Sequence, residues 1–421
     1  MKLIYDNIHG YIRVDDHEQR IIDAPIFQRL RKISNLGLAE YVYPGATHTR
    51  FAHSLGTLYV MDRVARQLID EGVLKESDKK ILRIVALLHD IGHYPFSHVL
   101  QDTMKEKFRE ETVDHELIAT ILIDKCDEIR KQIECITTAE EVKSILQRTN
   151  VDKPLYSYLM SSSLDVDKID YLQRDSIHSG APYGRIDIDR LISTITVDNI
   201  DHPSYLVIRE KGKQAIENFL IARYHMFQTL YFHKTVAAFE LMLNKICFEL
   251  IGTTLPTWNE IKKMSIEDFR DYDDHSVWQQ IKQSSKGKGI TSELSRMLIN
   301  RTPLKLAHEI TQLSEHAPNG IIDSLMEEED IAQHISNKTD VPSDSIFYLK
   351  MPEISFISDD LEQTVWLKSD DNCYEIVKDK NSIIYHLWAS KYRTIRIYTT
   401  NNNYKEKINH HFAKTLKSKL V

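Results

Sequence analysis

Apolar residues recur at helical spacing along most of this chain, and residues 77–98 show the pattern most clearly. From Ile81 to Ile91 the apolar positions are three or four residues apart, which predicts a buried helix. Ser77 stands where an N-cap is favoured, and Asp78 suits the positive end of the helix dipole. We therefore expect one helix that continues through the whole apolar run.

Four polar side chains, His89, Asp90, His93 and His98, lie in or directly after this apolar run. In a continuing helix, His93 would lie on the same side as His89, one turn further on. Burying such groups without partners costs roughly 2–7 kcal/mol for each neutral polar group. A bound metal ion would compensate most simply, so we expect the chemistry of the protein to centre here.

The remaining pattern predicts a mainly α protein, since long segments keep the 3.6-residue period and only 13 Gly and 11 Pro occur in 421 residues. Asp23 and Pro25 together are typical of a helix start, with a capping Asp and Pro in the first turn. The expected elements are a hairpin over residues 1–14, helices over 26–37, 50–72 and 214–251, and an antiparallel pair over 194–210.

Beyond about residue 340 the pattern contains more strand-like segments. Strands are expected over residues 354–357, 364–367, 374–377 and 394–399, and helices over 380–391 and 403–416. We therefore predict two parts, a helical core over residues 1–300 and a small α+β region over 301–421.

Composition narrows the class of protein. The net charge of −8 argues against attraction to nucleic acids or anionic membranes. The four cysteines form no CxxC pair, which is typical of reduced thiols in a cytosolic protein. No stretch approaches the ~20 apolar residues of a membrane helix, so we expect a cytoplasmic protein with neither a membrane nor a nucleic-acid partner.

Two imidazoles and two carboxylates, from His53, His89, Asp90 and Asp167, supply the donors that a hydrolytic metal centre needs. Mixed N/O donors suit one divalent ion of Mn, Fe, Mg, Zn or Ni, whereas the absence of thiolates argues against structural zinc. Each residue alone is an ordinary core or surface group. Their joint occurrence beside apolar helical runs favours a metal site.

Several long motifs resemble one family, the HD-domain phosphohydrolases, and within it the deoxynucleoside triphosphate (dNTP) triphosphohydrolase branch. They include DNIHGYI, YPGATHTRFAHSLG, LLHDIGHYPFSH, DVDKIDYLQRD and YFHK. The resemblance is dense through about residue 240 and faint beyond it, at NRTPLK. It implies an HD-domain helical core, whereas the C-terminal region stays unassigned.

By position in these motifs, the resemblance implies that His53, His89, Asp90 and Asp167 are the metal ligands. It places His98 and His115 beside the scissile bond, with His93 lining the same pocket. Histidine suits such a role because its ordinary pKa near ~6.5 allows either protonation state.

One position departs from the family pattern. Members often carry an Asp three residues after the His98 position, and this chain has Gln101 there, followed by Asp102. Gln101 holds no negative charge, so either the proton relay differs or Asp102 substitutes after a local shift.

The resemblance also implies a substrate site. Arg50, Lys168 and Arg223 match phosphate-holding positions, and a guanidinium suits bidentate phosphate contacts. The positions expected to line the sugar or base pocket are Asn35, Tyr171, Asp175 and Tyr231. Phe232 replaces a polar residue of the family, and Tyr231 and Phe232 could equally be helix core.

A regulatory site is a further implication. Lys2, Asp23, Gln28 and Arg31 match positions that bind a guanine nucleotide at a subunit interface in a human member of the branch. The alternative is structural, with Asp23 capping a helix and Arg31 paired within the fold. A guanine-nucleotide activator would require a homo-oligomer, a dimer or tetramer.

The sequence thus predicts a metal-dependent hydrolase that converts a dNTP and water to a deoxynucleoside and tripolyphosphate. The alternative is an HD phosphohydrolase for another substrate, such as a ribonucleotide, a phosphomonoester or a cyclic nucleotide. A nucleotide sensor or nucleic-acid-binding module is the third reading, against which the complete metal set argues.

Overall fold

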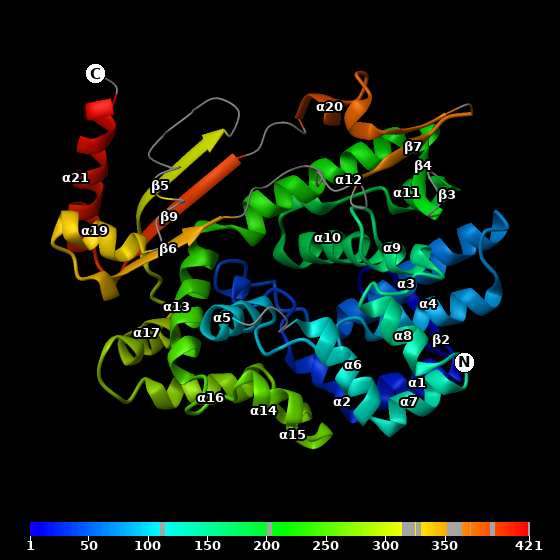
Figure 1. Ribbon diagram of the computed structural model, residues 1–421, viewed down its shortest axis with the longest axis horizontal. Coiled ribbons are helices and arrows are strands. Elements are labelled where there is room, and N and C mark those ends of the chain that lie inside the picture. The colour runs from blue at the N-terminus through cyan, green and yellow to red at the C-terminus, as the bar shows by residue number, and fades with distance from the viewer. Residues whose placement is uncertain are drawn as a thin grey trace.

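The computed structural model describes residues 1–109, 114–199, 204–313, 325, 330–351, 364–370, 372–387 and 392–419. Its helices cover most of the molecule, with small sheets at the periphery (Figure 1). No helix in these ranges has the length and apolar character that a membrane crossing requires. The mainly α fold class is confirmed.

The chain opens with the expected hairpin, in which strand β1 (Lys2–Asp6) pairs antiparallel with β2 (Gly10–Val14). Two short helices and two longer ones follow and form the centre of the core. They are α1 (Asp16–Asp23), α2 (Pro25–Gln28), α3 (Arg50–Asp70) and α4 (Glu76–Leu88). Helix α3 packs against α4 and against α10 (Val166–Ser179), and these three helices position the site described below.

Further helices surround this centre. They are α5 (His98–Phe108), α6 (His115–Lys125), α7 (Asp127–Glu134), α8 (Ala139–Leu146), α9 (Pro154–Met160), α11 (Ile188–Thr194), α12 (Lys213–Met226), α13 (Lys234–Leu250), α14 (Trp258–Lys263), α15 (Ile266–Asp271), α16 (Asp274–Ser284) and α17 (Ile290–Ile299). One large hydrophobic core joins nearly all of them.

Two further sheets complete the fold. Strands β3 (Ile195–Asn199), β4 (Ser204–Arg209), β7 (Trp366–Lys368) and β8 (Cys373–Glu375) form one sheet in that order. Strands β5 (Lys305–Leu313), β9 (Tyr392–Thr399) and β6 (Ile346–Lys350) form the other. Helices α19 (Ile331–Thr339) and α21 (Asn402–Lys419) pack on the second sheet, and α20 (Ile383–Leu387) lies near the first (Figure 1).

The C-terminal region is therefore α+β, as expected, but part of it joins the core. Strand β7 pairs in parallel with β4, which lies before residue 300. The division at residue 300 stays a prediction, and the strand expected at 354–357 lies outside the described residues.

Several expected helix ends were wrong. Helix α4 begins after Lys75 instead of Ser77, and it ends at Leu88, so His93 lies in irregular chain. Asp23 closes α1 and does not cap α2, which ends at Gln28.

The run expected as one helix over 214–251 is also interrupted. A π-helical segment at Phe227–Tyr231 and a break at His233 separate α12 from α13. Apolar periodicity does not register such breaks, because the side chains on both sides of them remain buried.

Candidate active site

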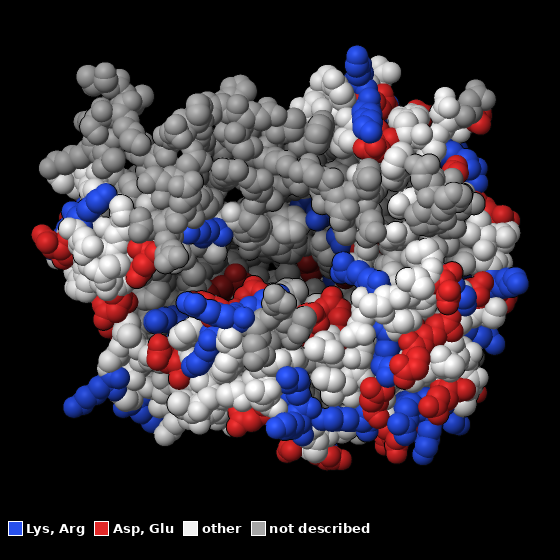
Figure 2. All heavy atoms as spheres, in the orientation of Figure 1, with Lys and Arg blue, Asp and Glu red and all other residues white. Residues whose placement is uncertain are grey.

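A cavity of about 1160 Å³ opens where the core meets the C-terminal region. Helices α3, α5, α10 and α13 supply its walls, and β6 of the C-terminal sheet closes one side. Figure 2 shows this face of the molecule hollowed near its middle, with side chains of both charges around the hollow. Of the residues expected in the site, the cavity lining includes Asn35, Arg50, His53, His89, Asp90, His93, His98, His115, Asp167, Lys168, Tyr171, Asp175 and Tyr231.

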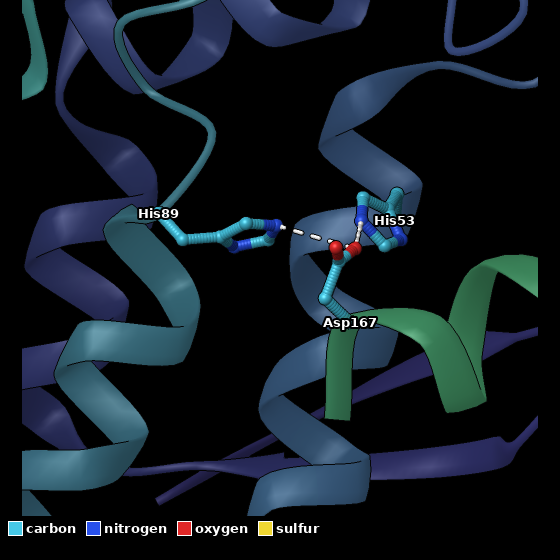
Figure 3. A group of neighbouring side chains, drawn as sticks. All are labelled: His53, His89 and Asp167. Carbon is cyan, nitrogen blue, oxygen red and sulfur yellow. Dashed lines mark hydrogen bonds and ion pairs between the residues drawn. The ribbon is translucent and has the colours of Figure 1, made fainter. Parts of the chain in front are cut away.

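The expected metal ligands converge from three helices. His53 lies in the first turn of α3, His89 at the end of α4 and Asp167 in the first turn of α10 (Figure 3). Nε2 of His53 lies 2.8 Å from Oδ1 of Asp167, and Nε2 of His89 lies 3.8 Å from the same atom. One donor atom from each of the three lies within 4.8 Å of the others, a spacing that a single ion could bridge.

The tautomer of His89 also fits a metal. Its Nδ1 lies 2.7 Å from the Ala86 carbonyl oxygen, which can only accept a hydrogen bond, so Nδ1 carries the proton. In the neutral ring Nε2 then holds a lone pair, and it is buried with no hydrogen-bond partner in the described structure, facing Oδ1 of Asp90 at 3.3 Å and Oδ1 of Asp167 at 3.8 Å. An unpaired acceptor costs free energy, and a metal at Nε2 would remove that cost.

Asp90 lies beside this group and is held ionised. Its Oδ2 is 2.6 Å from the guanidinium of Arg50, and its Oδ1 is 3.3 Å from His89 and 3.1 Å from His93. Burial alone would raise the pKa of Asp90, but Arg50 and the histidines hold it well below its usual range. The donor set therefore fits a divalent ion.

Asp170, which the sequence analysis overlooked, orients His53. Its Oδ2 accepts from Nδ1 of His53 at 2.7 Å, and its Oδ1 accepts from His9 of the hairpin loop at 2.6 Å. Burial would lower the pKa of His53, but the hydrogen bonds to Asp167 and Asp170 raise it to about 10 without metal. A metal at Nε2 must therefore displace a proton.

Replacing Asp170 with asparagine is expected to weaken metal binding by about 10- to 100-fold, the usual effect of losing a carboxylate behind a ligating histidine. Titration calorimetry with Mn²⁺ measures it. The control is Asp6→Asn, since Asp6 contacts Arg174 in the same buried network without touching His53. Equal weakening in both variants would contradict the orienting role.

Three histidines form a second cluster on the cavity wall. The rings of His93 and His115 stack with centroids 3.8 Å apart, and His98 lies edge-on 5.2 Å from His93. Burial and the charge of Arg50 lower the pKa of His98 to about 4. Burial chiefly lowers that of His115 to about 3, so both rings are neutral at pH 7 in the free site.

Gln101 takes part in this cluster directly. Nδ1 of His115 lies 3.2 Å from Oε1 of Gln101, so the amide accepts the hydrogen bond at the position where the resemblance implies a carboxylate. Asp102 has no such contact in the described structure and stands exposed at the cavity wall. The local shift considered for Asp102 has therefore not occurred.

The three cations expected to hold phosphate differ in their surroundings. Arg50 is buried and bridges Ser97 Oγ (2.7 Å) and Asp90. Lys168 pairs with the buried Asp165 at 2.7 Å. Arg223 is absent from the residues lining the cavity. Its positive charge nevertheless acts to lower the pKa of Lys168 and of Tyr171.

The expected sugar-side residues form one hydrogen-bonded group around Asp175. Its carboxylate accepts from Tyr231 (2.7 Å), from His48 (2.7 Å) and from Asn35 (3.3 Å). Tyr171 stands edge-on to Tyr231, with ring centroids 6.1 Å apart. Tyr231 therefore lines the cavity and is not plain helix core.

The four residues of the expected regulatory site lie elsewhere, on the hairpin and on residues 23–31. Arg31 donates to Gln28 at 2.7 Å and lies over the Phe51 ring. Among the described residues, no hydrogen bond or ion pair joins Lys2 or Asp23 to this pair, and both are exposed. The regulatory site therefore stays a prediction.

Sequence reasoning also missed His9 and His48, whose partners are far away in sequence, and Arg174, which pairs with the nearby Asp170 and with the distant Asp6. For Asp170 and Arg174 the sequence did offer a signal. They follow Asp167 at three and seven residues, so helical spacing places all three on one face of α10.

These features define a helical core with a His/Asp group that could hold a metal ion. The sequence model of the HD domain matches residues 50–175, and that of the HD associated region matches residues 186–420. The chain belongs to the HD-domain phosphohydrolase family, and that family binds a divalent metal.

Particular relatives narrow the comparison. An uncharacterized protein of Methanocaldococcus jannaschii is 36% identical over 65% of this chain and 53% of its own length. The deoxynucleoside triphosphate triphosphohydrolase SAMHD1 of Bos taurus is 31% identical over 58% of this chain and 46% of its own. The chain thus spans about half the length of these relatives.

Two solved structures resemble the whole chain. A hypothetical protein from Aquifex aeolicus has a TM-score of 0.77 at 26% identity and covers 98% of this chain and 99% of its own. A phosphohydrolase from Bacteroides thetaiotaomicron has a TM-score of 0.73 at 29% identity, covering 95% and 100%.

Proposed function

We propose that this protein is a dNTP triphosphohydrolase, which converts a dNTP and water to a deoxynucleoside and tripolyphosphate. The observation that carries the proposal is that one cavity holds three elements together: the metal-ligand group, the cations Arg50 and Lys168, and the Asp175 cluster. These elements suit a metal-bound phosphate, a polyphosphate chain and a sugar. The likeness to SAMHD1 supports the same substrate class.

We assign the ion to His53, His89, Asp90 and Asp167. When bound there, a divalent ion polarises a phosphoryl oxygen and lowers the pKa of a bound water. Arg50 and Lys168 hold the polyphosphate and stabilise charge that develops on it. Asp175 accepts from the 3′-hydroxyl, and Tyr171 packs against the deoxyribose.

His98 is neutral in the free site, so it enters the reaction as an acceptor of a hydrogen bond or a proton. A bound polyphosphate brings negative charge, which raises the pKa of His98 and allows it to deliver a proton to the leaving group. His115 and His93 hold the ring of His98 in place.

The other reading, an HD phosphohydrolase for a different nucleotide or phosphoester, is favoured by one observation. Gln101, a neutral amide, accepts the hydrogen bond of His115 Nδ1 at 3.2 Å where the resemblance implies an Asp, and a carboxylate oxygen of Glu116 lies 3.5 Å from the same nitrogen. A proton relay that differs in this way suits a substrate other than a dNTP.

Product analysis tests the proposal. The metal-supplemented protein is given each dNTP and each NTP, alone and with GTP or dGTP, and the products are separated by ion-pair chromatography. We expect deoxynucleoside plus tripolyphosphate. Orthophosphate or monophosphate products, or activity on ribonucleotides alone, would overturn the proposal in favour of the other reading.

Asp175→Ala separates these readings further. It should reduce dNTP hydrolysis by at least about 10-fold, since a buried acceptor for the sugar hydroxyl is lost. A generic phosphomonoester assay should change little. Asp189→Ala, on an exposed helix turn away from the cavity lining, is the control.

Nucleotide activation also stays a proposal. We propose that Lys2, Asp23, Gln28 and Arg31 bind a guanine nucleotide where subunits of a homo-oligomer meet, since Lys2 and Asp23 are exposed and free to face a second chain. Light scattering with and without GTP tests it, with a rise in mass on GTP addition as the expected result.

A further inference from the structure

Asp274, in the first turn of α16, lies between two loops of the active site. Its Oδ2 accepts a hydrogen bond from the backbone N–H of Ser34 at 2.9 Å. Its Oδ1 accepts from the backbone N–H of Phe96 at 2.7 Å. Ser34 precedes Asn35 of the Asp175 cluster, and Phe96 is two residues before His98, so one buried carboxylate joins both sides of the site.

The Phe96 loop needs external support. Phe96 and Ser97 both have φ of 52°, and Ser97 has ψ of −115°, a conformation that L-residues rarely adopt. Such a conformation persists only where the surroundings determine it. Helix α16 contacts the loop at two points. Asp274 accepts from the Phe96 N–H, and the Trp278 ring packs edge-on against the Phe96 ring with centroids 5.8 Å apart.

The loop in turn orients groups that face the cavity. Ser97 Oγ accepts from Nε of Arg50 at 2.7 Å and donates to the Ser34 carbonyl at 3.3 Å. His98 is the residue that follows Ser97 and begins α5. The position of Phe96 therefore sets the positions of Arg50 and of the His98 ring.

Asp274 is not needed for the helix itself. Asp273 is the N-cap of α16, accepting from Ser276 N–H at 3.0 Å, and it also pairs with Lys32. Asp274 points away from its own helix and toward the site. Its burial costs free energy as a charged group, and the hydrogen bonds from the Ser34 and Phe96 N–H groups offset that cost.

We propose that Asp274 is a positioning residue, by which the HD associated region fixes the Asn35 and His98 loops of the active site. The catalytic part of this proposal rests on the proposed function, whereas its geometric part does not. It gives a part of the chain beyond the HD domain a role in the reaction through the two loops that it positions.

The test compares Asp274→Ala and Asp274→Asn with Asp273→Asn in the full chain. Asn keeps one acceptor oxygen for one of the two N–H groups, whereas Ala keeps none. We expect kcat to fall about 10- to 100-fold in Asp274→Ala, the scale of a 1 Å misplacement, with KM changed less than threefold. Asp274→Asn should fall between Ala and wild type, and Asp273→Asn should keep wild-type kcat.

An activity-independent measurement accompanies the kinetics. Histidine labelled at the ring carbon Cε1 gives an NMR resonance for His98, assigned with His98→Ala, and hydrogen exchange reports the Ser34 and Phe96 amides. We expect Asp274→Ala to shift the His98 resonance and to expose both amides, while circular dichroism shows that the variant remains folded at the assay temperature. An unmoved resonance with protected amides would overturn the proposal.

The two proposals fail differently. A wild-type protein that hydrolyses no dNTP contradicts the proposed function, and the NMR and exchange results then decide the role of Asp274 alone. An active Asp274→Ala with wild-type kcat contradicts the positioning role whatever the substrate.

Discussion

Replacing His89 with alanine is expected to remove the bound metal and to lower hydrolysis about a thousand-fold or more. His89 offers an unpaired, buried Nε2 to the ion, and alanine leaves no donor there. The metal contributes several kcal/mol of transition-state stabilisation, and ~4 kcal/mol corresponds to about 10³-fold in rate. Metal content by plasma mass spectrometry and initial rates measure the effect.

His386→Ala is the matched control for His89→Ala, because His386 is exposed in the C-terminal region and remote from the cavity lining. It should keep the wild-type metal content and rate. If His89→Ala keeps both as well, His89 is not a ligand and the assignment of the site is wrong.

Replacing Arg174 with alanine is expected to lower the free energy of unfolding by about 3–5 kcal/mol, because it leaves buried carboxylates without their cation. Arg174 is fully buried and contacts Asp170 at 2.8 Å and Asp6 at 2.9 Å. The hairpin carrying Asp6 and His9 should then loosen from α10. Urea unfolding followed by circular dichroism measures the change.

Arg63→Ala supplies the comparison for Arg174. Arg63 also forms one ion pair with a carboxylate, that of Asp189, but Asp189 is mostly exposed. Water solvates such a pair nearly as well, so the loss should be about 0–1 kcal/mol. Equal unfolding free energies for the two variants would show that the buried ion pairs of Arg174 contribute no more to stability than the exposed pair of Arg63.

Much of the fold followed from local pattern. The hairpin over residues 1–14, the helix from Arg50 that ends before Gly72 and the strand pair near 195–209 lie where expected, since each depends on period and turn residues nearby in sequence. Helix ends were predicted less accurately. Helix α4, for example, ends at Leu88 although apolar residues continue beyond it. The loop from His89 to Ser97 is irregular yet buried, and apolar spacing cannot distinguish that from a helix.

The candidate ligands were also accessible from sequence, since a histidine or aspartate inside an apolar run needs an explanation that surface residues do not. By itself the sequence determined which residues are candidates for the chemistry, through the HD motif and its flanking helices. Only the tertiary structure decided which partners hold them: Asp170 behind His53, Gln101 against His115 and Asp274 between the Ser34 and Phe96 loops. Except for Gln101 and His115, these contacts join residues more than 100 positions apart in sequence. A polar contact becomes strong only in a buried, low-dielectric environment, and that environment forms only when the distant segments pack together.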